Sequence, residues 1–232
     1  MIRVIVSLCL LLPLLLPSAA VAGSPFLPSR AQFDALFPER IAFYSYEGFV
    51  EAVRQTPGFA DWGDEVGRRQ EMAAFLGQIA HESDELRAQR EYKRENWDKY
   101  CRDDARLPCA PGRQYYGRGP IQLSWNYQYK AAGDFLGIDL WSDPDRVARD
   151  STVAWRTALW YWMTQPGESE QPAHAALRGG AGFGATTRAI NGPLECDKPA
   201  DPDARRKNAR RAEFYRHASQ LFGVPLLHPL GC

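Results

Sequence analysis

The most informative run of this chain reads Tyr115-Tyr116-Gly117-Arg118-Gly119-Pro120-Ile121-Gln122-Leu123-Ser124-Trp125-Asn126-Tyr127. It is preceded by the pair His81-Glu82 and by a further carboxylate at Glu91. Two acids followed by aromatic, glycine and amide residues suit a site that holds a neutral sugar. Hydrolysis of a glycosidic bond needs one carboxylic acid to protonate the leaving oxygen and one carboxylate on the opposite face.

The N-terminal residues read as an export signal. Arg3 is the only charge before an almost wholly apolar run from Val4 to Leu16, and Ala20-Val21-Ala22 has the small-residue pattern of a cleavage site. The competing interpretation is a membrane anchor, but the apolar run is short for a bilayer span. We therefore expect a signal peptide at residues 1–22, a mature domain at residues 23–232, and a secreted or periplasmic protein.

The composition limits the class of partner. The whole chain has 28 basic and 28 acidic residues, and losing Arg3 leaves 27 against 28, a net charge of −1. Nucleic-acid binders usually carry a net basic face, so we expect no nucleic-acid partner. The local cluster at residues 205–211 reads mostly as a solvated helix face.

Cysteine usage agrees with export to an oxidising compartment. Beyond Cys9, four cysteines remain, and they allow three pairings. We predict Cys101–Cys109, which are close in sequence, and Cys196–Cys232, which would tie down the C-terminal segment. A zinc site is the alternative, but no pair of cysteines has the CxxC spacing and no histidine pair lies nearby.

Helical patterns dominate the chain. Apolar spacing and capping residues predict helices at Tyr46–Arg54, Glu65–Glu82, Asn126–Leu136, Thr152–Met163 and Arg206–Phe222. Leu86–Tyr92 is a candidate hairpin, and Gln165–Gly184 is the longest expected irregular stretch. The sequence shows no internal repeat, no low-complexity tract and no clear linker, so we expect one mainly α unit. We also expect a monomer.

Glu82 stands out because of its helical phase. It lies three residues after Ile79 and seven after Phe75, on the apolar face of the expected helix. Burial of an unpaired carboxylate is costly and would raise its pKa, which suits a general acid. The alternative is a helix that frays before Glu82 and leaves the side chain in solvent.

The partner carboxylate is left open by the residues alone. Four acids follow within a short distance: Asp84, Glu85, Glu91 and Glu95. Asp84 and Glu85 are close to Glu82 in the chain, whereas the partner must lie across a cleft with room for a sugar and a water.

The run 115–127 offers several sugar contacts. Gly117 and Gly119 permit close approach of the backbone to a ligand. The amide of Gln122, the hydroxyl of Ser124 and the amide of Asn126 suit hydroxyl and acetamide groups. Flat faces come from Tyr115, Tyr116, Trp125 and Tyr127, although aromatic residues are more often part of the core.

Four segments together resemble one known family. They are residues 75–83 (FLGQIAHES), 108–112 (PCAPG), 115–127 and Ile190-Asn191-Gly192. The combination resembles the family 19 glycoside hydrolases, which are plant-type chitinases also found in bacteria, over about residues 43–232. The resemblance implies an α+β lysozyme-like fold that is mainly α, with two lobes around a central substrate cleft.

The resemblance also implies roles for individual residues. The acid of the family's His-Glu pair matches Glu82. The base of the shorter bacterial members, nine residues later and ten before a cysteine, matches Glu91. The lysine-x-glutamate of plant members would instead indicate Glu95. The serine that holds the attacking water matches Ser124, and sugar contacts match Gln122, Tyr127 and Asn191. A supporting charge network maps onto Glu195 and Arg211.

Departures from the family pattern are equally specific. Gln128 stands where plant members usually have asparagine. Ser83-Asp84-Glu85 stands where the family often has threonine and glycines. The first plant disulfide has no counterpart, several cleft loops are shortened, and no cysteine-rich chitin-binding module is present.

We therefore expect a secreted endochitinase that hydrolyses β-1,4 bonds between N-acetylglucosamine units with inversion. Chitin or a similar oligosaccharide is the expected partner, with no membrane contact after signal cleavage. No metal or organic cofactor is expected, because two carboxylates suffice. The alternatives are a peptidoglycan-cleaving glycosidase and a non-catalytic protein that binds chitin oligomers.

Overall fold

The computed structural model describes residues 24–102 and 107–232. Its helices, in chain order, are α1 (Arg30–Leu36), α2 (Tyr46–Arg54), α3 (Glu65–Glu82), η1 (Arg94–Lys99), α4 (Asn126–Leu136), η2 (Pro144–Ala148), α5 (Ser151–Thr164), α6 (Ala173–Arg178), α7 (Phe183–Glu195) and α8 (Pro202–Phe222). In the described residues, β structure is limited to isolated bridges. The predicted mainly α class is confirmed.

The predicted signal peptide, residues 1–22, lies outside the described residues. Among the residues that the structure does describe, no helix combines the length and the apolar character needed to cross a membrane.

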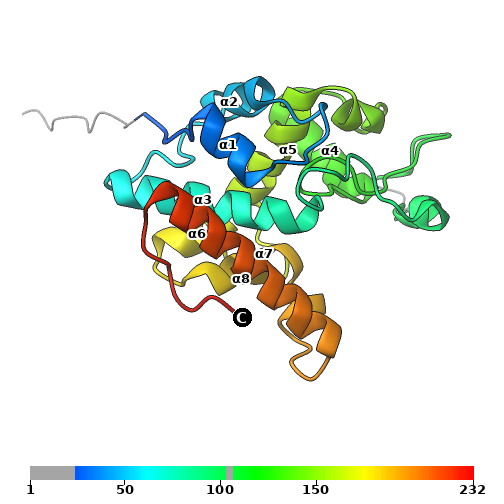
Figure 1. Cartoon of the computed structure of the whole chain (residues 1–232). Helices are drawn as coiled ribbons and strands as arrows, with labels where there is room; N and C mark the ends of the chain where they lie inside the picture. The colour runs from blue at the N-terminus through cyan, green and yellow to red at the C-terminus, as the bar shows by residue number, and fades with distance from the viewer. Residues whose placement is uncertain (1–23, 103–106) are drawn as a thin grey trace, which may run out of the picture.

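Helix α3 runs through the middle of the molecule (Figure 1). Asp64 caps its N-terminus by accepting a hydrogen bond from the backbone of Gly67, and its second half is buried on all sides. It packs against α8, and a Cβ placed on Gly77 would lie 2.9 Å from Cα of Tyr215. Glycine at this position therefore allows the two helices to approach closely. The packing places the C-terminal end of α3, with Glu82, against α8.

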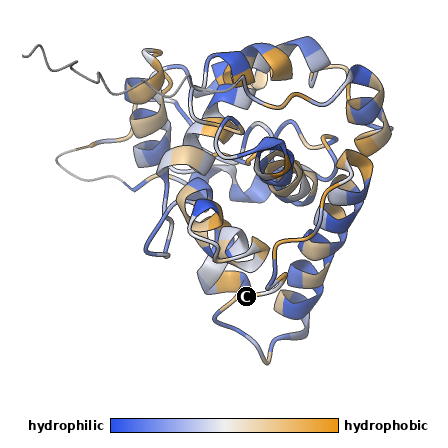
Figure 2. Cartoon of the chain, turned by 90° about the vertical axis from the view of Figure 1, so that its left-hand side faces the viewer, coloured by the Kyte–Doolittle hydropathy of each residue, from blue (hydrophilic) through white to orange (hydrophobic). Residues whose placement is uncertain are grey.

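The aromatic core lies on the other side of α3. The Trp155 ring of α5 contacts Phe33, Tyr44, Phe49 and Phe75, with ring centroids 5.0 to 6.4 Å apart. These contacts join α1, α2, α3 and α5 into one packed group. Hydrophobic and hydrophilic residues alternate along the helices in Figure 2, as expected for helices with one buried and one exposed face.

Two predictions about local structure are wrong. Leu86–Tyr92 does not form a hairpin, because Arg90 bridges instead to Arg118. The stretch Gln165–Gly184 is not continuously irregular, because α6 lies within it and α7 begins at Phe183. Proline and glycine in this stretch hid both helices: Pro172 occupies the N-cap position of α6, and Gly182 that of α7.

Both predicted disulfides are present. Cys101 and Cys109 are joined with a Cα–Cα distance of 6.1 Å, and Cys196 and Cys232 with one of 5.2 Å. The first closes a loop beside α4. The second fixes the C-terminal segment to the end of α7.

Candidate active site

A cavity of about 230 Å³ opens at the C-terminal end of α3. Its walls come from α3, the turn before α4, α5 and α7, and its lining residues are Glu82, Ile121, Gln122, Leu123, Ser124, Trp125, Gln128, Tyr161, Ile190 and Asn191. A second cavity of about 530 Å³ shares Gln128, Tyr161, Ile190 and Asn191 and continues past Tyr127 to Leu194. The two form one extended cleft.

Glu82 is the carboxylate that lines the smaller of the two cavities, and Glu168 lines the larger one. Glu82 is the last residue of α3, and 18% of its side chain is exposed. Its Oε1 accepts a hydrogen bond from Nη2 of Arg211. The helix does not fray before Glu82, and the carboxylate is paired rather than buried alone.

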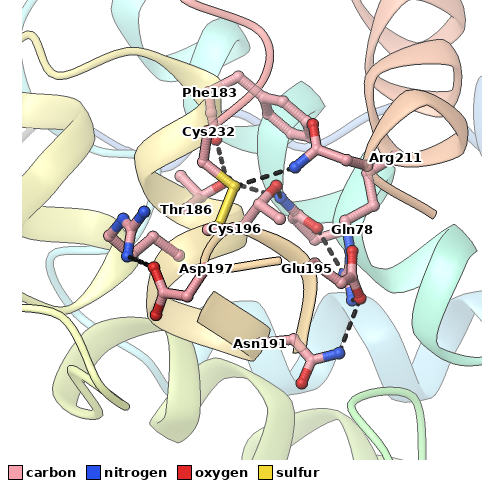
Figure 3. The surroundings of a disulfide bond; sticks show 12 residues. Gln78, Phe183, Thr186, Asn191, Glu195, Cys196, Asp197, Arg211 and Cys232 are labelled. Atoms are coloured by element: carbon pink, nitrogen blue, oxygen red, sulfur yellow. Dashed lines mark hydrogen bonds and ion pairs between the residues drawn. A yellow bond between two sulfur atoms is a disulfide. The ribbon is translucent and has the colours of Figure 1, made fainter. Parts of the chain in front are cut away.

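Arg211 of α8, which donates to Glu82, also belongs to a buried polar cluster with Gln78 and Glu195. Figure 3 shows Arg211, Gln78, Glu195 and Asn191 of this cluster. The Nε of Arg211 donates to Oε2 of Glu195 at 2.8 Å, its Nη2 donates to Oε1 of Glu195 at 2.7 Å, and its Nη1 donates to the Gln78 side chain at 2.8 Å. Asn191 Nδ2 also donates to Glu195, at 2.7 Å. The residues assigned to a charge network by the family resemblance therefore lie in direct contact.

Charge governs titration within this cluster. Burial by itself would raise the pKa of Glu195, but hydrogen bonds and the positive charge of Arg211 hold it below its ordinary value. Burial by itself would lower the pKa of Arg211, but the negative charges and hydrogen bonds of Glu82 and Glu195 raise it above its ordinary value. The guanidinium thus stays charged between two carboxylates.

His81 adjoins this cluster as a neutral side chain. Burial first, and then the charge of Arg211, lower its pKa to about 3. Its Nε2 lies 4.0 Å from Oε1 of Glu195, and its buried Nδ1 has no hydrogen-bond partner among the described residues.

Glu91 lies outside the lining of both cavities. Its backbone N–H donates to the Gly117 carbonyl at 2.8 Å, and its Oε1 accepts from Asn96 Nδ2 at 3.0 Å and from the Tyr100 hydroxyl at 3.1 Å. Its other oxygen, Oε2, is buried without a partner in the described part of the chain. The ring of Tyr100 contacts that of Trp125, a cleft residue, at 5.5 Å. Burial raises the pKa of Tyr100 to about 12, with a further contribution from Glu91, so its hydroxyl remains a donor.

Glu95 differs from Glu91 in its surroundings. It is exposed in the first turn of η1. Asn96 and Tyr100, which follow it by one and five residues in the sequence, both donate to Glu91.

The turn before α4 presents Gln122 and Ser124 to the cleft. Gln122 and Trp125 both have positive φ, 51° and 73°. The Gln122 amide donates to the carbonyls of Gly119 and Ala88 at 3.0 and 3.3 Å, and the Ser124 hydroxyl donates to the Gln122 carbonyl at 2.9 Å. These bonds hold the turn and fix the direction of the Ser124 oxygen.

The predicted sugar-binding aromatics fall into two groups. Tyr127 is 38% exposed and stacks beside Trp125 at 6.1 Å, at the edge of the cleft. Tyr116 is only 3% exposed, with Trp97 stacked at 3.9 Å and the Arg118 guanidinium 3.6 Å from its centroid.

Gln128, noted in the sequence as a departure from the family asparagine, lines the cleft. Three residues of the site were not identified from the sequence: Tyr161 lines the cleft, and Asn96 and Tyr100 hold Glu91. Tyr161 sits in an aromatic-rich helix where any ring reads as core. Asn96 and Tyr100 follow Glu91 by five and nine residues, and no pattern in the sequence marks either one as its partner.

Comparison with known proteins gives a consistent result. The family model for chitinase class I, glycoside hydrolase family 19, matches residues 31–232. An endochitinase of Phaseolus vulgaris is 36% identical over 247 residues, covering 93% of this chain and 74% of the relative. A crystal structure of a bacterial family 19 chitinase superposes with a TM-score of 0.83 at 46% identity, covering 88% of this chain and 98% of the other. Chitinase C of Streptomyces griseus gives a TM-score of 0.83 at 42% identity, covering 88% and 79%.

Proposed function

The chain belongs to the family 19 glycoside hydrolases, and we propose that it cleaves β-1,4 bonds between N-acetylglucosamine units of chitin with inversion at the anomeric carbon. Glu82 is the general acid and Glu91 the general base. Water attacks the anomeric carbon on the face opposite the leaving oxygen, which takes its proton from Glu82.

One observation carries the assignment of Glu82. It is the one acidic side chain among the described residues lining the cavity of about 230 Å³, and Gln122, Ser124 and Asn191 line the same cavity. A sugar held by these polar groups would have its glycosidic oxygen within reach of the carboxyl group. Arg211 fixes the rotamer of that group from behind.

The choice of Glu91 over Glu95 rests on orientation. Two donors hold one oxygen of Glu91, and its second oxygen accepts no hydrogen bond from the described residues. Glu95 is exposed on η1. A base must be held within hydrogen-bond reach of its water, which favours the oriented carboxylate.

Ser124 supports the same water. Its hydroxyl donates to the Gln122 carbonyl, so its lone pairs are free to accept a hydrogen bond from the water. Gln122, Tyr127 and Asn191 supply the sugar contacts. Trp125 lines the cleft, whereas the ring of Tyr116 is covered by Trp97 and Arg118.

We further propose that residues 1–22 direct export and are removed, leaving residues 23–232 as the catalytic domain. Mass spectrometry of the protein recovered outside the cytoplasm would give a mature N-terminus at Gly23. An intact N-terminus would contradict this proposal.

The decisive experiment compares three glutamine variants with the wild type on chitin hexamer. General acid–base groups contribute about 10²–10⁴-fold, so Glu82→Gln and Glu91→Gln should each lower kcat by at least about 100-fold. Glu95→Gln should stay within about twofold, since the residue is exposed. Unchanged circular dichroism is the control for folding. Substantial activity in Glu82→Gln would overturn the acid assignment, and a larger loss in Glu95→Gln than in Glu91→Gln would exchange the bases.

Stereochemistry tests the mechanism separately. Proton NMR of the first products should show the α-anomer, because inversion converts a β-linked sugar to α. An initial β-anomer would indicate retention. Parallel assays on colloidal chitin and purified peptidoglycan should show turnover of the former, and a preference for peptidoglycan would redirect the substrate assignment.

A further inference from the structure

A left-handed turn follows the proposed acid. Asp84, Glu85 and Leu86 have φ of 51°, 59° and 64°, although none is glycine. Positive φ costs an L-residue about 1 kcal/mol or more at each position. The sequence itself departs from the family pattern here, where glycines are usual. The side chains in this turn are therefore candidates for a role that glycine could not fill.

The backbone of the turn is held without the Asp84 side chain. Ser83 Oγ accepts from the Leu86 N–H at 2.9 Å, and the Ala88 N–H donates to the Ser83 carbonyl at 2.8 Å. Leu86 is fully buried and anchors the turn in the core. The carboxylate of Asp84 is therefore free for another role.

That carboxylate receives donors from three directions. Oδ1 accepts from Nη2 of Arg87 at 3.0 Å and from Nη2 of Arg210 at 3.2 Å, while Oδ2 accepts from the Tyr92 hydroxyl at 3.2 Å. Hydrogen bonding from Arg87, opposed by burial and supported by Arg210, holds the pKa of Asp84 below its ordinary value. Glu85 adds a weaker pairing with the same two arginines.

Two of these donors are chain neighbours of the proposed catalytic machinery. Arg210 precedes Arg211, which holds Glu82, and Tyr92 follows Glu91. One carboxylate therefore ties the segment carrying the base to the helix that orients the acid.

We propose that Asp84 is a positioning residue that sets the separation of Glu82 and Glu91 by joining Arg210 of α8 to Tyr92. The inference rests on the proposed function, since it concerns the same pair of carboxylates. Inverting hydrolysis depends on that separation, because a water must fit between the base and the sugar.

Glycine at position 84 separates the backbone role from the side-chain role. Glycine adopts positive φ without strain, so Asp84→Gly should leave the melting temperature unchanged or raise it. The same variant removes all three side-chain bonds. We expect its kcat on chitin hexamer to fall about tenfold, with KM within twofold of wild type, because a small misplacement of catalytic groups slows the chemical step.

The network supplies its own controls. Glu39 pairs with the far side of Arg87 at 2.9 Å and reaches neither α8 nor Tyr92, so Glu39→Gln should keep wild-type kcat. Tyr92→Phe removes only the tie to the base segment and should show part of the Asp84→Gly loss. Raising NaCl from about 0.05 to 1 M shortens the Debye length to about 3 Å, so kcat should fall in the wild type and change less in Asp84→Gly.

The outcomes are distinct. A wild type that does not hydrolyse the hexamer refutes the proposed function. An active wild type with Asp84→Gly at equal kcat, or with only KM raised, overturns the positioning role alone. Equal losses in Glu39→Gln and Asp84→Gly would also overturn it, because the effect would then be a general loss of surface charge.

Discussion

The acid side and the base side of the proposed site are built differently. Glu82 is held by Arg211, which is buried between Glu82, Glu195 and Gln78 on helices far apart in the sequence. Glu91 is held by neutral donors from Asn96 and Tyr100, only five and nine residues further along the chain. One side is a buried charge cluster, and the other is a local, half-exposed segment.

The two sides should therefore contribute differently to stability and to catalysis. The acid side is part of the core, where α3, α7 and α8 meet, so damage there should affect stability and catalysis together. The base side consists of Glu91, Asn96 and Tyr100 in and beside the surface segment η1, so damage there should affect catalysis alone.

Removal of Arg211 should have the largest effect. Arg211→Gln leaves Glu195 buried without its cation, and breaking a buried ion pair costs about 3–5 kcal/mol. We expect urea unfolding to show that loss and hexamer hydrolysis to fall more than about 100-fold. Arg216→Gln, an exposed change on the same helix, should stay within about 0.5 kcal/mol. An Arg211→Gln protein as stable as the wild type would contradict the conclusion that the acid side contributes to the stability of the core.

The pH dependence of stability should come next in size. His81 binds a proton in the folded state only near pH 3, but in the unfolded chain near pH 6.5. Between these values the unfolded state binds more protons, so the contribution of His81 is complete above pH 6.5 and is lost as pH falls toward 3.

This contribution can be isolated by substitution. Between pH 6.5 and pH 3, the free energy of unfolding of His81→Gln should fall by about 2 kcal/mol less than that of the wild type. The side chain of His81 is mostly but not wholly buried. The exposed His217→Gln is the matched control. An unchanged slope in His81→Gln would show that the acid side does not bury a neutral histidine.

Loss of one donor on the base side should have the smallest effect. Tyr100→Phe removes a hydrogen bond of 3.1 Å to Glu91. Loss of about 1.4 kcal/mol of orientation would lower kcat about tenfold, while the free energy of unfolding changes by less than about 1 kcal/mol. Stopped assays on the hexamer and urea unfolding measure the two quantities. A stability loss as large as that of Arg211→Gln would erase the distinction between the two sides.

The sequence predicted the helices that carry clear local signals. α2, α3 and α4 match their predicted bounds, and α5 differs by one residue at each end. The caps Ser45, Asp64 and Asp150 mark the starts of α2, α3 and α5, whereas α4 has no side-chain cap and ends at Gly137. α7 was missed because Gly182, Gly192 and Pro193 read as breakers, and Asn191 indeed leaves helical geometry at φ −148°. Its N-terminal bonds come from distant residues, which no local pattern reveals.

The candidate site divides in the same way. The phase of α3 pointed to Glu82, but the contact between Glu82, Arg211 and Glu195 joins three helices and came only from the family resemblance. The sequence pattern could not rank the four acids after Glu82. What distinguishes Glu91 is that Asn96 and Tyr100 donate hydrogen bonds to it, and this is visible only in the structure. Asp84 was only one of these four acids, and of its three donors Arg87 and Tyr92 lie nearby in the sequence, whereas Arg210 depends on how α8 packs.

The start of α7 has a consequence for biosynthesis. Gly182 offers no side-chain cap, and the first N–H groups of the helix, from Phe183 and Gly184, donate instead to the carbonyls of Leu227 and Pro229 at 3.0 and 2.9 Å. The ribosome makes α7 before it makes these carbonyls, with the whole of α8 in between. A nascent chain that stops short of residue 227 holds every residue of the proposed site, yet lacks the caps of the helix that carries Asn191 and Glu195. Completion of the acid side is therefore tied to synthesis of the segment beyond α8.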